Sequence, residues 1–449
     1  MPNFEDNEPV LSANTRSYVG ETAFADDRLD RKPLAEKLTG YLSRLNDGAV
    51  LAIDAPWGEG KTWFGKNWAK HLEDNEYKVV YIDAFEQDYI EDPFMLITSE
   101  ILDVIEDEEG LVEDIKKSSV EVAKALLPIG AKALFNFGGR ILLGSGDISE
   151  EFKEVLEVGT NTTSELTSKW IEKSLEAYSQ DKLAMQEFKI KLATYAQSQD
   201  KPIVIFIDEL DRCKPNFAVN LIERIKHFFD VPNIIFVLLL NREQLEKAVK
   251  GIYGSETDAS TYLSKFISFF FALPKPIRDG LNYENKLESF INATMRKYNF
   301  PRDGNDHDGF IKRLKTWVVY FDMSLRDIEK AVALYAFSGI TGGVSWILTY
   351  LIVFKVKKPD LFKKIVLENA EAHLEAKERI EEFIKISRTK GLYDESILEF
   401  YLQWHEASLN NYSKVGEHFS SLLQQYHRFH HSPKTLLPIL AKSIDLNID

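Results

Sequence analysis

The chain has 449 residues, more than one compact hydrophobic core usually organises, so two or three domains are expected. Hydrophobic residues make up 44% and charged residues 28%, which excludes a chain that is disordered throughout and leaves only the first dozen residues without apolar material to bury. A formal net charge of −16 excludes a surface that attracts nucleic acid as a whole, although it is compatible with a local basic groove.

The cysteine count and the N-terminal residues indicate the cellular compartment. Cys213 is the only cysteine, so no intramolecular disulfide forms, as is usual in a reducing compartment. The first residues are acidic where a secretory signal peptide is basic and then apolar, so secretion is not expected. Together these observations predict a cytoplasmic protein.

Short apolar runs alternate with helical patterns in the first half of the chain. Residues 33–47 carry apolar side chains at helical spacing, and residues 65–74 follow a second helical pattern. The strand-like runs are VLAID (50–54), KVVYIDA (78–84), PIVIFID (202–208) and NIIFVLLL (233–240). Continuous apolar strands separated by helices predict a parallel sheet covered on both faces, which is an α/β fold.

The segment between the second and third strands is long and mainly helical in pattern. Its part from about 106 to 180 opens with acidic residues, continues with a glycine-rich apolar stretch at 125–146 and closes with a polar helix. Lys132 and Arg140 interrupt the stretch, which leaves it short of the roughly 18 to 20 apolar residues that a membrane-spanning helix needs. We predict a helical insertion within a first domain that covers residues 1–275.

Residues 276–449 are helical in pattern and are predicted to form a C-terminal helical lid or bundle. Within them, residues 331–354 carry no charged side chain and are long enough to cross a membrane, with basic residues at 355–358 as an anchor. The sequence SGITGG at 338–343 instead favours a break between two shorter helices. A buried pair of helices is the prediction, and a membrane span is the alternative.

A glycine-containing loop lies between the first strand and the next helix, the position of a phosphate-binding loop. Gly58 and Gly60 allow backbone N–H groups to turn toward phosphates. Lys61 is suited to contact the β- and γ-phosphates, and the Thr62 hydroxyl is suited to bind Mg²⁺. Ala55 stands where such loops usually begin with glycine, so an unusual conformation is expected at the start of the loop.

Two tryptophans, Trp57 and Trp63, flank the glycines of this loop. Packing against the protein core is the simpler role for them, and stacking on a nucleotide base is the alternative. The predicted nucleotide contacts in the loop are Trp57, Gly58, Glu59, Gly60, Lys61, Thr62 and Trp63.

The third strand ends in two acidic residues, Asp208 and Glu209. Ligands of open parallel sheets bind at the carboxyl ends of the strands. Asp208 is therefore predicted to hold Mg²⁺ together with Thr62, and Glu209 to polarise the water that attacks the γ-phosphate. The alternative is that both acids only stabilise the N-terminus of the following helix. No Asn-Lys-x-Asp guanine motif is present in the sequence, which favours ATP over GTP.

The loop and the acidic segment together resemble the signature of the KAP family of P-loop NTPases. The two motifs are Trp-Gly-x-Gly-Lys-Thr at 57–62 and Ile-Asp-Glu-Leu-Asp-Arg-Cys-x-Pro at 207–215. Further similar segments are DRLDR (27–31), NREQL (241–245), YLSKF (262–266) and LRDI (325–328). The resemblance covers residues 20–360 in separate islands.

The resemblance implies a P-loop fold with an added strand between the loop strand and the acidic strand. Residues 233–240 would form that strand, and Asn241 after it would be a polar sensor near the γ-phosphate. Asp30 and Arg31 would belong to the adenine or ribose side of the pocket. Many members of the family carry an insertion between the two nucleotide motifs, where 125–146 lies.

Two arginines, Arg212 and Arg326, are candidates for stabilising the charge that develops on the transferred phosphoryl group. For Arg212 the alternative is an ion pair with Asp211 or another neighbouring acid. For Arg326 it is a solvated position on a helix, and similarity to the arginine motif of the KAP helical lid favours the catalytic role.

The resemblance implies an ATP- and Mg²⁺-dependent switch with slow or partner-stimulated hydrolysis, acting in bacterial antiviral defence or mobile-element conflict. A homo-oligomer and partner proteins of the same system are expected, and direct nucleic-acid binding is not. The alternatives are a scaffold with peripheral membrane contact and little turnover, and a motor stimulated by nucleic acid, which the negative charge disfavours. His427, His430 and His431 lack the cysteines or spaced carboxylates of a metal site.

Overall fold

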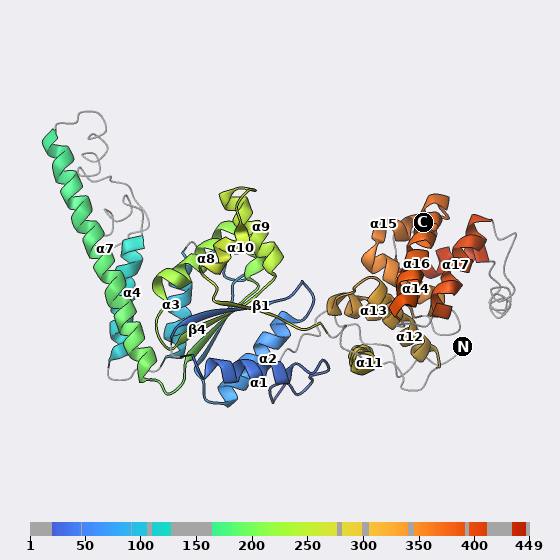
Figure 1. The fold of residues 1–449 in the computed structure, drawn as a ribbon, viewed down its shortest axis with the longest axis horizontal. Helices are drawn as coiled ribbons and strands as arrows, with labels where there is room; N and C mark the ends of the chain where they lie inside the picture. Colours follow the sequence, from blue (N-terminus) through green and yellow to red (C-terminus); the bar gives the residue numbers. More distant parts are fainter. Residues whose placement is uncertain are drawn as a thin grey trace, which may run out of the picture.

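Five parallel strands form the central sheet of the computed structural model (Figure 1). They are β1 (Ala49–Asp54), β2 (Val79–Asp83), β3 (Ile203–Asp208), β4 (Ile234–Leu240) and β5 (Phe269–Ala272). Their order is β2-β3-β4-β1-β5, so β4 lies between the strand before the glycine loop and the strand that ends in acids. The predicted α/β fold and the added strand are thereby confirmed.

The structure describes ten stretches of the chain, to which every structural statement below refers. They are residues 20–45, 47–90, 92–105, 110–126, 164–275, 281–298, 305–339, 345–390, 395–410 and 433–445.

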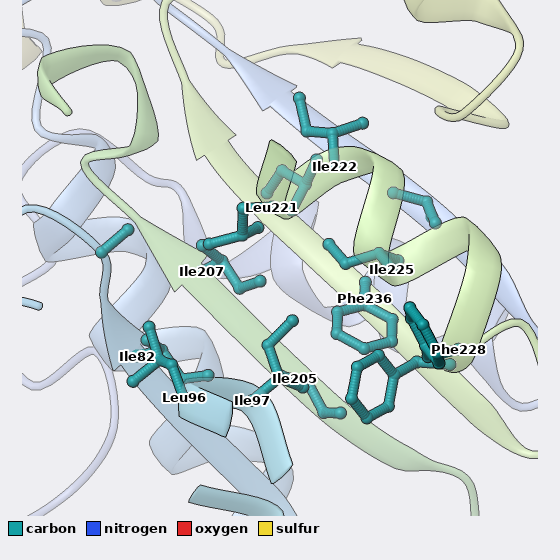
Figure 2. Close-up of a cluster of buried hydrophobic side chains, with 14 of the residues drawn as sticks. Ile82, Leu96, Ile97, Ile205, Ile207, Leu221, Ile222, Ile225, Phe228 and Phe236 are labelled. Carbon is teal, nitrogen blue, oxygen red and sulfur yellow. The ribbon is translucent and has the colours of Figure 1, made fainter. Parts of the chain in front are cut away.

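The strands alternate their side chains between two hydrophobic layers. On one face, Phe206 of β3 packs edge-on against Trp68 of α2 (Lys61–Asp74), and α1 (Lys32–Leu42) covers the same layer. The opposite face carries α3 (Pro93–Val104) and α8 (Pro215–Phe228). Figure 2 shows Ile205 and Phe236 of the sheet and Phe228 of α8 in that second layer.

The edge strand β5 was not predicted from the sequence. Its four residues are short of a clear strand pattern, and they pair only with β1, so two of them are exposed. The central strands β3 and β4 are buried at every position, which is why their continuous apolar runs identified them.

The predicted helical insertion contains two described helices, α4 (Leu111–Leu126) and α7 (Ser164–Ser198), which lie side by side in Figure 1. α7 continues past the expected end at residue 180, and its last turns bury Phe188, Leu192 and Tyr195 against the α3 and α8 layer. Most of the glycine-rich stretch 125–146 lies outside the described residues.

All described elements after β5 are helices. They are α11 (Leu281–Arg296), α12 (Asn305–Tyr320), α13 (Leu325–Ser338), α14 (Ser345–Lys357), α15 (Pro359–Val366), α16 (Ala370–Lys390), α17 (Glu395–Leu409) and α19 (Pro433–Ile444). We call them the helical region, which Figure 1 draws on the side of the sheet away from α7.

The uncharged segment 331–354 forms parts of two helices, α13 and α14, as predicted. Every residue from Ser345 to Phe354 is buried in the core of the helical region. None of the helices in the described stretches combines the length and the apolar character that crossing a bilayer requires.

A buried chain of polar groups crosses the core of the helical region. His373 Nδ1 lies 2.9 Å from His405 Nδ1, and His405 Nε2 lies 2.5 Å from the Tyr350 hydroxyl. Ser408 Oγ lies 3.2 Å from His373 Nε2 and connects the chain to Glu368 at its surface end. Burial lowers the pKa of both histidines, because the charged imidazolium would lose its hydration.

The two buried histidines predict a loss of stability in mild acid. In the unfolded chain a histidine has a pKa of about 6.5, so below that pH it binds a proton that the buried histidine does not bind. Stability that is present above this pH is therefore lost as the pH falls. Each histidine contributes at most about 1.4 kcal/mol per pH unit. We expect the thermal midpoint to fall between pH 6.5 and 5.5, and to fall less steeply in His405→Gln than in the unmodified chain; equal slopes in the two would contradict this role of the buried histidines.

Candidate nucleotide site

The glycine loop connects β1 to α2 at the carboxyl edge of the sheet. Gly58 and Gly60 have φ of 84° and 77°, a region that other residues rarely adopt. A Cβ at Gly58 would lie 2.7 Å from Ser324 Oγ, so close approach also requires glycine there. Ala55 has no positive φ, and its N–H continues the β1–β4 pairing by donating to Leu240 at 3.2 Å. The unusual conformation expected at Ala55 is therefore not seen, because the position does not need glycine.

Lys61, the first residue of α2, is buried inside the loop. Its ammonium group donates to the carbonyl oxygens of Ala55 at 2.6 Å and Pro56 at 3.3 Å. Burial lowers the pKa of Lys61, and the nearby carboxylates of Asp211, Asp208 and Asp54 oppose that shift. The structure thus places a desolvated cation within the loop, where phosphate charge would bind.

Asp208 at the end of β3 faces the loop. It is 1% exposed and accepts hydrogen bonds from the Thr62 side chain and from the Tyr81 hydroxyl, the latter at 2.8 Å. Burial raises the pKa of Asp208, and both hydroxyl donors counteract this rise. The two predicted metal ligands, Thr62 and Asp208, are therefore in contact.

Glu209 follows Asp208 in a left-handed conformation with φ of 58°, which costs a non-glycine residue about 1 kcal/mol. Its carboxylate forms an ion pair with Arg212 at 2.6 Å. Burial raises the pKa of Glu209, and Arg212 opposes the rise. The ion-pair alternative for Arg212 is thus seen, with Glu209 as the partner in place of Asp211.

The two loop tryptophans differ in environment. Trp57 is 46% exposed, and its indole N–H donates to Asp211. Trp63 packs edge-on against Phe24, with ring centroids 5.7 Å apart, so the packing role is seen for this ring. Trp57 is the more exposed of the two rings, and stacking on a base stays a prediction.

Asn241 lies at the carboxyl end of β4, next to the loop strand. Its side chain caps α9 (Arg242–Tyr253) by accepting from Gln244 N at 3.4 Å. Beside it, Asp54 at the end of β1 accepts a hydrogen bond from Arg242 N at 2.8 Å. The sensor role of Asn241 stays a prediction, at a position that adjoins the site.

Asp30 and Arg31 lie behind the phosphate loop. Arg31 is 3% exposed and donates to the carbonyl oxygens of Glu59 at 2.7 Å and Gly60 at 3.2 Å. Burial lowers the pKa of Arg31 to about 10, so the guanidinium stays charged. Asp30 pairs with Lys286 of α11 at 3.0 Å. Arg31 therefore contacts the loop backbone, and the place of Asp30 and Arg31 beside adenine or ribose stays a prediction.

The side chain of Glu59 is buried next to Lys275. It is 3% exposed, and it lies 3.5 Å from the Lys275 ammonium, which also binds Asp322 of the helical region at 3.0 Å. Burial raises the pKa of Glu59, and Lys275 and Arg31 oppose the rise. The side chain of Glu59 is thus engaged by Lys275, and nucleotide contact by Glu59 stays a prediction.

Arg326 reaches the loop from the helical region. Its backbone N–H donates to the carbonyl oxygen of Gly58 at 3.1 Å. Ser324 caps α13 and forms a capping box with Asp327, which pairs with Lys357 at 2.9 Å. The structure thus brings Arg326 to the loop, and its catalytic role stays a prediction.

Sequence reasoning missed three residues that contribute to this site: Tyr81, Lys275 and Asp54. Tyr81 sits on β2, and nothing in a single sequence shows that β2 and β3 are neighbours. Lys275 connects distant segments, a contact with no local pattern. Asp54 ends a predicted strand at the ligand-binding edge, and that position was a usable signal. His427, His430 and His431 lie outside the described residues.

The residues present fit a magnesium ion. Mg²⁺ prefers oxygen ligands and is commonly held by one or two protein side chains plus substrate phosphates. The Thr62 hydroxyl and the Asp208 carboxylate supply such oxygens at one point beside the loop. In the described stretches no group of three His, Cys, Asp or Glu side chains is arranged around a metal ion, so an all-protein cage is not seen there.

Removing the Tyr81 hydroxyl should weaken magnesium binding in a pH-dependent way. The hydroxyl donates to the Asp208 carboxylate, so Tyr81→Phe raises the pKa of Asp208 and lets protons compete with the ion. We expect Mg²⁺ affinity, measured from the metal dependence of ATP binding, to fall roughly tenfold at pH 6 and less at pH 8. Equal loss in Tyr77→Phe, whose ring faces Lys201, would contradict this role.

Comparison with known proteins identifies a matching family. A model of the KAP family P-loop domain matches residues 31–383, well over half of the chain. The phage T7 exclusion protein of Escherichia coli (strain K12) is 23% identical over 169 residues, which cover 34% of this chain and 22% of that protein. The chain thus matches less than a quarter of that relative's length.

Two solved structures of the Aeropyrum pernix ORC2 protein, its ADPNP-ADP complexes and its ADP form, are also similar. Each shares 11% sequence identity, and the similarity covers 96% of this chain and 97% of theirs. The TM-scores are 0.35 and 0.33, too low to support a common fold. The fold assignment therefore rests on the strand order and on the family match.

Proposed function

The chain belongs to the KAP family of P-loop NTPases, and from this premise we propose that it is a Mg-ATP-binding and hydrolysing molecular switch. The observation that carries the proposal is the juxtaposition at one sheet edge of a glycine loop, a buried lysine and an acidic pair of which Asp208 is buried. Lys61 lies in the loop, and Asp208 contacts Thr62 at its end.

The residues divide the work of phosphoryl transfer. The loop amides and Lys61 hold the phosphates, and Thr62 and Asp208 would hold Mg²⁺. When bound, the ion neutralises charge that develops on the β- and γ-phosphate oxygens. Glu209 accepts a proton from the attacking water, and its raised pKa makes it a stronger base than an ordinary carboxylate.

The switch would connect the site to the helical region. Arg326 of that region contacts the loop, and Asp322 pairs with Lys275, which contacts the loop in turn. A change at the γ-phosphate could therefore be transmitted to α13. Asn241 and the Arg326 guanidinium are the proposed sensors. Slow or partner-stimulated turnover, assembly with further copies and a cytoplasmic location belong to the same proposal.

The biological role that we propose is defence against phage, in concert with partner proteins. Its support is the 23% identity with the phage T7 exclusion protein. Because the match covers only 22% of that relative, it gives no support for a particular target of the defence. Plating efficiency of phage T7 on Escherichia coli that expresses the chain should fall, and should recover with Lys61→Met; equal plating with an empty vector would oppose the role.

Nucleotide turnover measured together with mass in solution tests the proposed function. Phosphate release from ATP in excess of release from GTP, with Mg²⁺ required, is the expected result. A nucleotide-dependent change in mass would support an assembling switch. If the chain binds neither ATP nor GTP and releases no phosphate from either nucleotide, the NTPase role is contradicted.

A further inference from the structure

Three consecutive carbonyl groups of the phosphate loop are held from outside by two distant segments. The Gly58 carbonyl accepts from Arg326 N at the start of α13, at 3.1 Å. The carbonyls of Glu59 and Gly60 accept from the Arg31 guanidinium, at 2.7 and 3.2 Å. Gly60 also accepts the first bond of α2, from Phe64 N at 3.0 Å. The three peptide planes that follow Gly58, Glu59 and Gly60 are therefore held in one orientation.

The direction of the carbonyls determines the direction of the amides. In a planar trans peptide, the C=O of one residue and the N–H of the next point in opposite directions. Donors outside the loop that hold the carbonyls of residues 58–60 thus turn the N–H groups of residues 59–61 away from them, toward the concave side. A row of inward N–H groups is the nest that binds phosphate oxygens.

The bonds to the loop carbonyls depend on the guanidinium of Arg31, because this side chain is buried against the loop. The side chain lies against the loop so closely that a Cβ at Gly60 would be 2.9 Å from its Nη1 atom. A buried guanidinium presents several donors in a rigid plane, whereas a lysine presents one compact ammonium group. Arg28, three residues earlier, pairs with Asp26 at the surface and provides a matched control.

The second support belongs to the helical region. The Ser324 capping box fixes the first turn of α13, and Arg326 N reaches the loop from that turn. Lys275 adds an ionic connection between Glu59 of the loop and Asp322, which lies two residues before Ser324. The start of α13 is thus seated on the loop in this structure.

We propose that Arg31 and the N-terminal turn of α13 are positioning elements that orient the phosphate-binding amides, so that nucleotide affinity and seating of the helical region on the loop are coupled. The proposal rests on the proposed nucleotide binding and adds its regulation. By linkage, if seating raises the affinity for nucleotide by some factor, nucleotide raises the seating equilibrium by the same factor.

The first test compares Arg31→Met and Arg31→Lys with Arg28→Met, using Mg-ADP as the probe for equilibrium binding to the full chain. We expect a roughly tenfold rise in Kd for Arg31→Met, a smaller rise for Arg31→Lys and none for Arg28→Met. Thermal unfolding of each variant separates loss of the fold from loss of positioning. No Mg-ADP binding by the unmodified chain would overturn the proposed function, whereas equal Kd for the unmodified chain and a folded Arg31→Met would overturn the positioning role alone.

The second test needs no substitution. Hydrogen exchange of the Arg326 amide, the donor to Gly58, should slow when saturating Mg-ADP is added, because nucleotide favours the seated state. Amides of α8, which lies on the sheet away from this contact, should exchange at an unchanged rate. Unchanged exchange at Arg326 in the nucleotide-bound chain would overturn the coupling.

Discussion

Lys61→Met is expected to raise the Kd for Mg-ATP on the order of 100-fold, which corresponds to about 3 kcal/mol. The ammonium group is buried in the loop and would exchange its bonds to Ala55 and Pro56 for bonds to phosphate oxygens. A methionine keeps the length of the side chain and removes its charge, so phosphate would enter a desolvated site without its main counter-charge. Equilibrium titration with a fluorescent ATP analogue measures the effect.

Folding is not expected to suffer in Lys61→Met. Burial lowers the pKa of Lys61, which shows that the charged form is disfavoured in the free site. Replacing such a cation by an apolar side chain tends to be neutral or stabilising. Lys70→Met on the exposed side of α2 is the control, since Lys70 pairs with Asp74 at the surface. If the ATP affinity of Lys61→Met is unchanged, the glycine loop does not bind the phosphates as proposed.

Glu209→Gln is expected to lower ATP turnover by a factor of about 10² to 10⁴, the usual contribution of a general base. The amide has the shape of the carboxylate and cannot accept the proton from water. Because Glu209 lies beyond the loop residues that hold phosphates, Kd for ATP should change little. Steady-state phosphate release and equilibrium binding, measured on the same preparation, separate the two effects.

The environment of Glu209 gives this prediction its structural basis. Its left-handed conformation places the side chain beside the buried Asp208, and Arg212 holds its carboxylate at 2.6 Å. The control is Glu243→Gln, an exposed acid on α9 that pairs with Lys247. If ATP turnover is undiminished in Glu209→Gln, or is diminished equally in Glu243→Gln, Glu209 is not the general base.

The fold core could be predicted because its strands are apolar at every position. Residues 203–208 and 234–240 are buried on both faces, so their sequence needs no alternation to be identified. The place of β4 between β1 and β3 came from the family resemblance, since strand order is not a local property. The short edge strand β5, exposed on one side, carried no comparable signal.

The part of the candidate site that is formed by short sequence motifs could be predicted. Gly58, Lys61 and Asp208 follow strands and precede helices, so their type and position indicate phosphate binding. The contacts of Arg31 with the loop could not be predicted, because its partners are backbone carbonyls nearly thirty residues later, which no side-chain pattern reveals. Tyr81 and Lys275 were missed for the same reason: their contacts exist only after the sheet and the helical region have assembled.

The identity of the nucleotide retained after incubation with Mg-ATP tests the central claim most directly. The unmodified chain and Glu209→Gln would each be incubated with Mg-ATP, separated rapidly from free nucleotide and denatured, and the released nucleotide identified by chromatography. Bound ADP in the unmodified chain and bound ATP in Glu209→Gln is the predicted result, because one site binds both and Glu209 is needed only for hydrolysis. Retention of no nucleotide by either chain, or of ATP by both, would contradict an ATPase built on this loop and this acidic pair.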